Sequence, residues 1–361
     1  MRFTKRIIAL ILAALMLLSF AACHKKGETA VKIGDIKFTS GYYACVLFFT
    51  DSSARSKVSE QLEEEGKSTD DINYYKQKID GKKYVDWVKE ETIKTLKKVA
   101  AAKTYCKKNK LELGDDAEQL KSYAEYYWEQ GGYSAVLPEN GVAKETYIDY
   151  MTDLSYEDLY FDHVFGEKGE KEVTKKELKK ELSTNYALVD MIDVSFTDLE
   201  DEEKTSKTKQ LEGYLDELKE GKRTFEEIYK EYNNVSDEEE DTAEEDNTDK
   251  PLDSRATLVG NENTSFANDY FDKIYKMKKD DVKIINKDDD AGKILVVKKD
   301  VLEDPYYLKT YDSTLRHAVA DEDFDKLIEE YAETLKFKEY SSATGNFDVE
   351  DIYYPETTSA Q

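Results

Sequence analysis

The feature that most constrains the fold is a stretch from Tyr186 to Lys299, which begins and ends with an apolar, strand-like run. The first run covers residues 187–196 and the second covers residues 293–298. Between the two runs, leucine and tyrosine recur at helical spacing over residues 207–220. Strands at both ends with a helix between them predict a small α+β domain rather than a helical bundle.

Two further helices are expected inside this stretch. Gly221 supplies a stop for the first helix, and Thr224 with Glu227 forms a capping box that starts the second. A short third helix is predicted at residues 268–277, ahead of the closing strand.

Two segments of the stretch resemble signatures of the parvulin-type peptidyl-prolyl isomerase domain. Residues 218–232 are similar to the family pattern L-x-x-G-x-x-F-x-x-x-A-x-x-Y-S, and residues 271–282 are similar to F-x-x-a-x-f-x-L-x-x-G-e-v. The resemblance implies a parvulin-like fold and a pocket that would receive a proline of a peptide substrate.

The family carries one histidine in its first strand, in a V-x-H-I-L pattern, and another in its last strand, in G-Y-H-I-I. The matching positions, residues 189–193 and 291–295, hold Met191 and Lys293 where the histidines would be. Met191, Phe266, Phe271 and Lys293 are therefore the candidate remnant of the peptide pocket, and no catalytic residue is assigned. Phe266 and Phe271 have the alternative interpretation of ordinary core aromatics.

The first 22 residues have the form of a secretion signal. Arg2, Lys5 and Arg6 are followed by an apolar run from Ile7 to Phe20, which is shorter than the roughly 20 residues that span a membrane. The run ends in Ala21-Ala22-Cys23, which resembles a bacterial lipobox. Cys23 is therefore predicted to carry lipid and to anchor the chain on the outer face of the bacterial cell membrane. A plain signal peptide with a chance cysteine is the alternative.

A hairpin or extended arm and several helices are expected before the α+β domain. Residues 31–38 alternate around a Gly-Asp turn, Thr39 or Ser40 can cap a long helix, and Thr174 with Glu177 forms another capping box. The other predicted helices cover residues 82–110, 115–129 and 144–161. A hairpin-like start, several helices and then the motif V-T-x-x-E-L just before a parvulin-like strand resemble the N-terminal region of the PrsA/SurA-type exported foldases. In that family the helical part is a chaperone that holds unfolded polypeptides.

The whole chain is thus predicted to be an α+β protein in which a small parvulin-like domain is inserted into a helical chaperone-like domain. After a connector at residues 304–311, a helix at residues 321–335 carries an apolar stripe, and we expect it to pack on the N-terminal helices. The predicted parts are a lipoprotein signal peptide at residues 1–22, a helical domain at 23–185, a parvulin-like domain at 186–303, a returning C-terminal helix at 304–340 and a mobile tail at 341–361.

Charge and composition exclude several classes of partner. The formal charge is −26, and it becomes −29 without residues 1–22, which hold three basic and no acidic side chains. Nucleic acid is therefore not expected as a partner, and contact with a membrane is expected through the lipid anchor only. Residues 236–250 are rich in Asp and Glu, and they are interpreted as a disordered insertion rather than a calcium site.

No metal or other cofactor is expected either. The three histidines are scattered and the cysteines lack metal-ligand spacing. Cys45 and Cys106 are interpreted as buried free thiols, with a disulfide left open.

Three functions remain in view. The first is a membrane-anchored extracytoplasmic chaperone of the foldase type, acting on unfolded or partly folded exported polypeptides, with its isomerase centre lost. The second is an active prolyl isomerase, and the third is a solute- or surface-binding lipoprotein. A homodimer is left open. Aromatic side chains suited to adaptable contact gather in the helical part, although most of them are expected to fill seams between helices: Tyr123, Tyr126, Tyr127, Trp128, Tyr133, Tyr147, Tyr150, Tyr156 and Tyr160.

Overall fold

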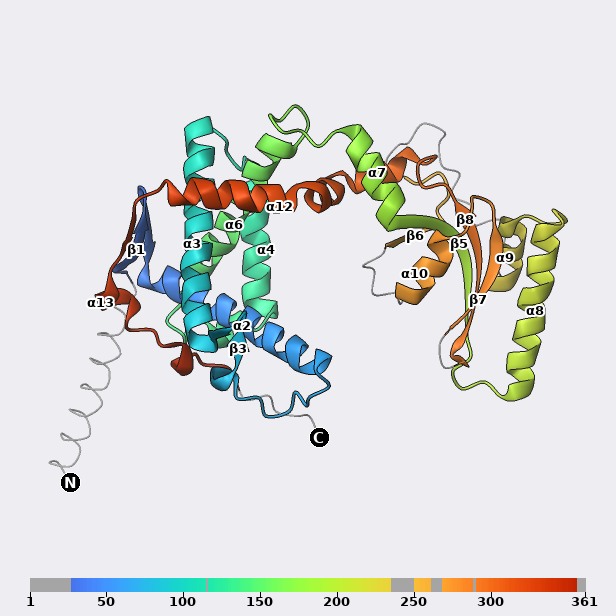
Figure 1. The fold of residues 1–361 in the computed structure, drawn as a ribbon, viewed down its shortest axis with the longest axis horizontal. Coiled ribbons are helices and arrows are strands. Elements are labelled where there is room, and N and C mark those ends of the chain that lie inside the picture. Colours follow the sequence, from blue (N-terminus) through green and yellow to red (C-terminus); the bar gives the residue numbers. More distant parts are fainter. Residues whose placement is uncertain (1–26, 115, 235–249, 261–267, 288–289, 356–361) are drawn as a thin grey trace, which may run out of the picture. The chain divides into compact units, whose positions relative to one another are not determined.

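The computed structural model describes residues 27–114, 116–234, 250–260, 268–287 and 290–355 (Figure 1). The predicted signal peptide, Cys23, Phe266 and nearly all of the acidic insertion lie outside these residues. The chain divides into two compact units, one formed by Met1–Glu170 with Glu322–Gln361 and the other by Lys171–Asp321. We call them the helical unit and the α+β unit. Among the described residues, no helix is both long and apolar enough to cross a membrane.

The helical unit is built from both ends of the chain. Its helices and strands, with α12 shared across the boundary between the units, are β1 (Thr29–Ile33), β2 (Ile36–Thr39), α2 (Ser40–Glu64), η1 (Tyr74–Lys76), β3 (Lys78–Ile79), β4 (Lys82–Lys83), α3 (Tyr84–Asn109), α4 (Asp116–Gln130), α5 (Tyr133–Val136), α6 (Lys144–Phe165), α12 (Asp312–Glu333), β9 (Phe337–Glu339), α13 (Ser341–Thr344) and η4 (Val349–Asp351). The predicted hairpin and long helices are confirmed, and Thr39 caps α2 by accepting a hydrogen bond from the Tyr42 amide.

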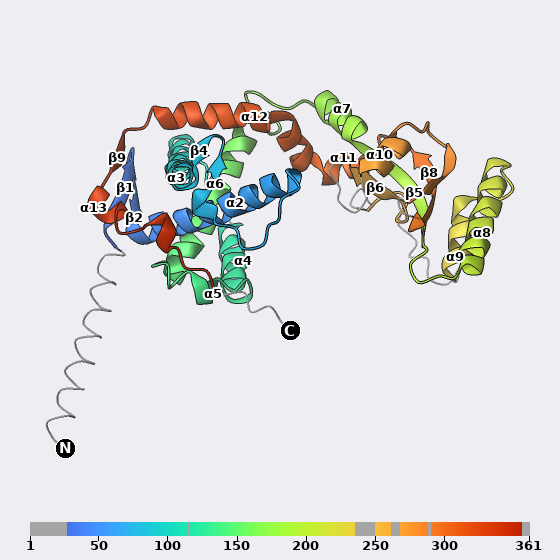
Figure 2. The same ribbon diagram turned by 60° about the horizontal axis from the view of Figure 1, so that its bottom comes forward.

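The returning C-terminal segment packs on the N-terminal helices, as predicted. Within the helical unit, α12 crosses α3 (Figures 1 and 2) and is tied to it by ion pairs from Lys94 to Glu329 at 2.8 Å and from Lys97 to Glu333 at 2.7 Å. Strand β9 then completes an antiparallel sheet of order β2-β1-β9, with Phe337 opposite Ile33. The helix begins at Asp312, nine residues before its predicted start.

The prediction of a mobile tail from residue 341 is wrong for the residues that the structure describes. Ala343 and Val349 are buried in the core of the helical unit. The Tyr354 hydroxyl donates to the buried Asp51 carboxylate at 2.8 Å, and its ring stacks on Phe48 with centroids 5.2 Å apart. Residues 341–355 therefore fold back because buried partners on α2 hold them.

The α+β unit contains the predicted sheet. Its elements are α7 (Lys175–Asn185), β5 (Tyr186–Ser195), α8 (Asp201–Lys219), α9 (Phe225–Asn233), β6 (Thr257–Gly260), α10 (Asn268–Tyr275), β7 (Val282–Asn286), β8 (Gly292–Lys299), α11 (Pro305–Thr310) and the start of α12. The strands pair antiparallel in the order β6-β5-β8-β7, and Ile192 lies opposite Leu295. The capping boxes of α7 and α9 form at Thr174 and Thr224 as predicted.

The boundaries of the α+β unit differ from the predicted residues 186–303. Helix α7, the predicted connector and the start of α12 all belong to it. The connector is itself a helix, α11, capped by the Asp304 side chain with Pro305 in its first turn. The guanidinium of Arg316 on α12 donates to the Val173 carbonyl ahead of α7 at 2.9 Å. This buried contact joins the two flanks of the sheet, which the sequence pattern does not reveal.

Helices cover both faces of the sheet, with α10 on one side and α8 and α9 on the other (Figures 1 and 2). Because alternate side chains of a strand point to opposite faces, each face gathers every second residue of β5 and β8. The α10 face buries Val189, Ile294 and Val296 with Phe271. The α8/α9 face buries Ile192 and Leu295 with Leu211, Phe225 and Ile228.

Candidate functional site

The residues predicted as a remnant peptide pocket are only partly brought together. Met191 lies on the α10 face, half-buried against the cluster that contains Phe271. Phe271 is 4% exposed, and its ring stacks on that of Tyr275 with centroids 5.5 Å apart. Phe271 is thus a core residue of this face, which agrees with its alternative interpretation.

Lys293 lies on the opposite face of the sheet from Met191. It pairs with Val194, a residue of the α8/α9 face, and its ammonium donates to the Asn286 amide oxygen at 2.7 Å. There it lines a shallow hollow of about 350 Å³ together with residues of α8 and β7. A side chain on that face cannot share a hydrogen-bond network with Met191, because the sheet separates them.

The position of Gly292 indicates which residue of β8 shares the face of Met191. A Cβ atom at Gly292 would lie 2.1 Å from the Val194 carbonyl oxygen, so this position requires glycine. When the glycine of the G-Y-H-I-I pattern is placed on Gly292, the histidine position falls on Ile294. Ile294 is buried on the same face as Met191. With this placement of the pattern, Ile294 rather than Lys293 is the position that shares a face with Met191.

The α10 face thus offers apolar contacts where the family pattern carries two imidazoles. The chain has three histidines, and neither of those in described residues belongs to the sheet. His163 on α6 contacts the Tyr105 hydroxyl at 2.8 Å, and His317 on α12 contacts Asp321 at 2.7 Å. Among the residues that the structure describes, no imidazole therefore lies at Met191 or Ile294 to polarise a peptide bond.

Charged side chains of the α+β unit gather instead around Asp190, which points to the other face from Met191. Its carboxylate is 4% exposed and contacts the Lys299 ammonium at 2.9 Å, and Lys299 also contacts Asp253 at 2.5 Å. Burial raises the pKa of Asp190, against the lowering effect of Lys299. The Oδ1 atom of Asp190 has no hydrogen-bond partner among the described residues. This network joins β5, β8 and the segment before β6, and the sequence pattern does not reveal it.

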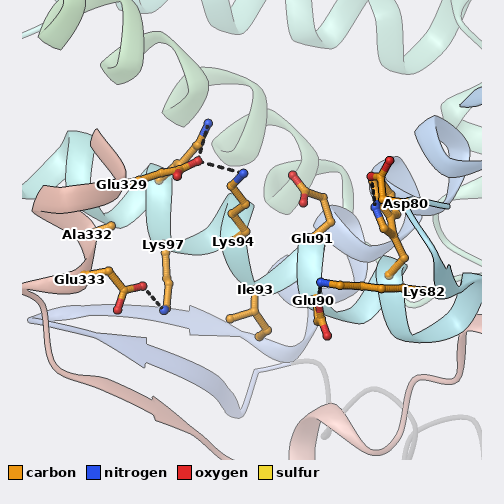
Figure 3. Close-up of a pocket in the computed structure, with 12 residues that line it drawn as sticks. Asp80, Lys82, Glu90, Glu91, Ile93, Lys94, Lys97, Glu329, Ala332 and Glu333 are labelled. Carbon is orange, nitrogen blue, oxygen red and sulfur yellow. Dashed lines mark hydrogen bonds and ion pairs between the residues drawn. The ribbon is translucent and has the colours of Figure 1, made fainter. Parts of the chain in front are cut away.

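The helical unit contains a pocket of about 460 Å³ between α3, α12 and the β3–β4 turn (Figure 3). Lys94 and Lys97 extend from α3 toward Glu329 and Glu333 of α12, and each forms an ion pair there. The described residues that line the pocket carry charges of both signs, so it does not offer a uniform charge that would select a ligand. Its contacts hold the returning helix in place.

The aromatic side chains of the helical part separate into two groups. Trp128, Tyr147, Tyr150 and Tyr160 are buried, and Tyr133 and Tyr156 are half-buried, so these six fill seams between helices. Tyr123, Tyr126 and Tyr127 are 56%, 60% and 52% exposed. Tyr126 and Tyr127 follow Tyr123 by three and four residues along α4, so both lie next to Tyr123 on one face of that helix. We call these three residues the tyrosine face.

The packed side of α4 explains why this face is open. Ala124 and Trp128 are buried against α6 and its neighbours, so helix packing uses the side that they occupy. Tyr126 and Tyr127 meet edge to face with centroids 5.6 Å apart, and the Gln119 amide donates to the Tyr123 hydroxyl at 3.3 Å. Three large rings therefore lie together at the surface. Single exposed apolar residues are common in proteins, but a cluster of them often marks a surface that binds another molecule.

Both cysteines in the described residues are buried free thiols, as interpreted from the sequence. Cys45 lies on α2 and Cys106 on α3, and burial raises the pKa of the Cys106 thiol to about 11. Neither thiol is activated as a nucleophile, because that requires a lowered pKa. No group of three potential ligand side chains in the described ranges is arranged to hold a metal ion.

No family model matches the chain, and no curated protein matches it by sequence. Solved structures that are similar to it include three foldase structures. Foldase protein PrsA from Streptococcus pneumoniae shares 12% identity, with 73% of this chain and 86% of that one covered and a TM-score of 0.38. Foldase protein PrsA from Lactococcus lactis shares 13% identity, with 87% of this chain and 96% of that one covered and a TM-score of 0.39. PrsA from Bacillus subtilis shares 16% identity over 72% and 90%, with a TM-score of 0.28. These structures belong to the foldases that the sequence motifs resemble.

Proposed function

We propose that this protein is a membrane-anchored extracytoplasmic chaperone of the foldase type, whose helical unit holds non-native segments of exported polypeptides on the tyrosine face. The observation that carries the proposal is the exposure of Tyr123, Tyr126 and Tyr127 on one side of α4. Tyrosine combines a large apolar ring with a polar tip, so it contacts many different segments with little loss of side-chain entropy. Lipidation at Cys23 would place this surface outside the cell membrane.

The architecture supports a chaperone over a solute-binding lipoprotein. A solute-binding protein would place its ligand between two α/β lobes, whereas this chain has an antiparallel sheet of four strands in one unit and mainly helices in the other. The returning helix α12 packs on the N-terminal helices, an arrangement that favours the foldase architecture over a solute-binding protein.

Removing the tyrosine face tests the proposal. With Tyr123, Tyr126 and Tyr127 all changed to serine, we expect client affinity to fall on the order of tenfold, because truncating aromatic anchors removes most of the energy of such a contact. Light scattering of a denatured client diluted with the purified mature protein measures the loss of protection from aggregation. The control changes the exposed Tyr275 and Tyr353 to serine and should leave protection intact. Equal protection by the triple variant and the parent would refute the assignment.

The proposed loss of the isomerase centre has its own test. Rotation about a prolyl bond has a barrier of about 20 kcal/mol, and the α10 face offers Met191 and Ile294 instead of a polar network at the twisting amide. We therefore expect no acceleration of a proline-limited refolding reaction, followed by fluorescence at increasing amounts of the protein. A rate that rises in proportion to the protein would show that the centre is active.

A further inference from the structure

We propose that the tyrosine face selects client segments rich in lysine and arginine. The inference rests on the proposed function and adds the chemical class of the bound segment. It is carried by the acidic row that lies beside the tyrosines and by the absence of a cation over their rings.

Helix α4 presents two adjacent rows of side chains to solvent. The first row follows the spacing i, i+4, i+7, i+11 and holds Tyr123 and Tyr126 between two glutamines. The second row has the same spacing one residue earlier and holds Glu118, Glu125 and Glu129. All three carboxylates are exposed, and only Glu129 among them contacts a cation in the described structure, Lys144 at 3.3 Å.

Tyrosines elsewhere in the chain already hold cations of the chain itself. Lys298 lies 5.5 Å from the centroid of Tyr275, Lys207 lies 5.3 Å from that of Tyr232, and Lys338 lies 4.4 Å from that of Tyr340. Within the described ranges, no lysine or arginine lies over Tyr123, Tyr126 or Tyr127, although these rings are the most exposed aromatic cluster. Their faces are open to a cation that arrives with a client.

The two features act on the same ligand group. A lysine or arginine over an exposed ring gains attraction from the ring quadrupole, and carboxylates in the next row add Coulomb attraction that salt weakens. A client glutamate would be repelled by the same carboxylates and would gain nothing from the rings. A chain with a formal charge of −26 reinforces this preference at longer range.

Three unstructured peptides of equal length and equal aromatic content test the proposal, with spacer positions occupied by lysine, glutamine or glutamate. Fluorescence anisotropy with the mature protein should give the order lysine, glutamine, glutamate from tightest to weakest. The difference should shrink as salt is raised from low to physiological ionic strength.

Two double variants locate the preference. Glu118→Gln with Glu125→Gln should weaken binding of the lysine peptide by about threefold and leave binding of the glutamine peptide unchanged. This is the size of effect expected for the loss of two exposed charges. Glu60→Gln with Glu64→Gln removes the same charge from exposed positions on α2. The affinity of this variant for the lysine peptide should equal that of the parent protein within error.

The outcomes separate this inference from the function on which it rests. If all three peptides bind equally and the tyrosine-to-serine variant loses all of them, the chaperone proposal holds and the preference for basic segments is refuted. Equal effects of the two double variants would also refute it, because general charge would then explain the result. If no peptide binds the parent protein, both proposals fail.

Discussion

Replacing Asp51 with alanine is expected to lower the free energy of unfolding of the helical unit by about 3–5 kcal/mol, the cost of leaving a buried ion pair without one partner. Its side chain is fully buried on α2. It accepts hydrogen bonds from the Tyr84 hydroxyl at 2.7 Å, the Tyr354 hydroxyl at 2.8 Å and the Arg55 guanidinium at 2.8 Å. The alanine variant would remove the carboxylate from all three donors, and of these the Tyr84 hydroxyl would keep the Asp51 backbone carbonyl at 3.1 Å.

The two tryptophans of the chain make this measurement specific. Trp87 and Trp128 are both buried in the helical unit, so their fluorescence during urea denaturation reports on that unit alone. Tyr354→Phe is the matched control, because it removes one hydroxyl from the same network and keeps the ring beside Arg55; we expect it to cost about 1 kcal/mol. A loss of less than 1 kcal/mol for Asp51→Ala would contradict the view that this carboxylate organises the core and its returning tail.

Glu157 is expected to make the helical unit less stable as the pH rises from about 5 to 8. Burial raises the pKa of this carboxyl on α6 from 4.5 to about 7, Lys98 opposes the shift, and Asp158 and Asp325 add to it. Because the folded pKa lies above the unfolded value, the stabilisation is fully present below about 4.5 and is lost as the pH passes through about 7. A difference of 2.5 between the two values corresponds to about 3 kcal/mol.

Glu157→Gln isolates this contribution from the other titrating groups. The variant cannot ionise at this position, so it should match the parent near pH 5 and exceed it by roughly 2–3 kcal/mol at pH 8. Urea midpoints followed by tryptophan fluorescence at several pH values give the comparison. If the difference between variant and parent is the same at pH 5 and pH 8, Glu157 does not titrate in this range.

The elements that the sequence predicted correctly have local signals. Thr174 and Thr224 each start a helix because a threonine and a glutamate three residues later satisfy backbone amides within one turn. The pairing of Ile192 with Leu295 follows from two apolar runs that must bury both faces. Hydrophobic spacing likewise located α3 and α6, although their ends lie a few residues from the predicted positions.

The features that the sequence did not predict depend either on partners far away in the chain or on the exact alignment of a motif, where an error of one residue matters. Residues 341–355 have no internal pattern, and their order depends on Asp51, about 300 residues away. Lys293 and Ile294 point to opposite faces because a strand alternates, so a shift of one residue in a motif match moves the candidate across the sheet. Helical spacing predicted burial for most of the aromatic positions without identifying which, and only the packing of α4 shows that Tyr123, Tyr126 and Tyr127 remain exposed.

The central claim is that non-native polypeptides are held on the helical unit and not on the face that resembles an isomerase. Site-specific photocrosslinking tests it most directly, with a photoreactive phenylalanine analogue placed at Tyr126 on α4 or at Tyr275 on α10, both of which are exposed. With an unfolded client in excess, the account predicts strong crosslinking from the position of Tyr126 and little from that of Tyr275. Crosslinking that occurs at Tyr275 and is absent at Tyr126 would contradict it.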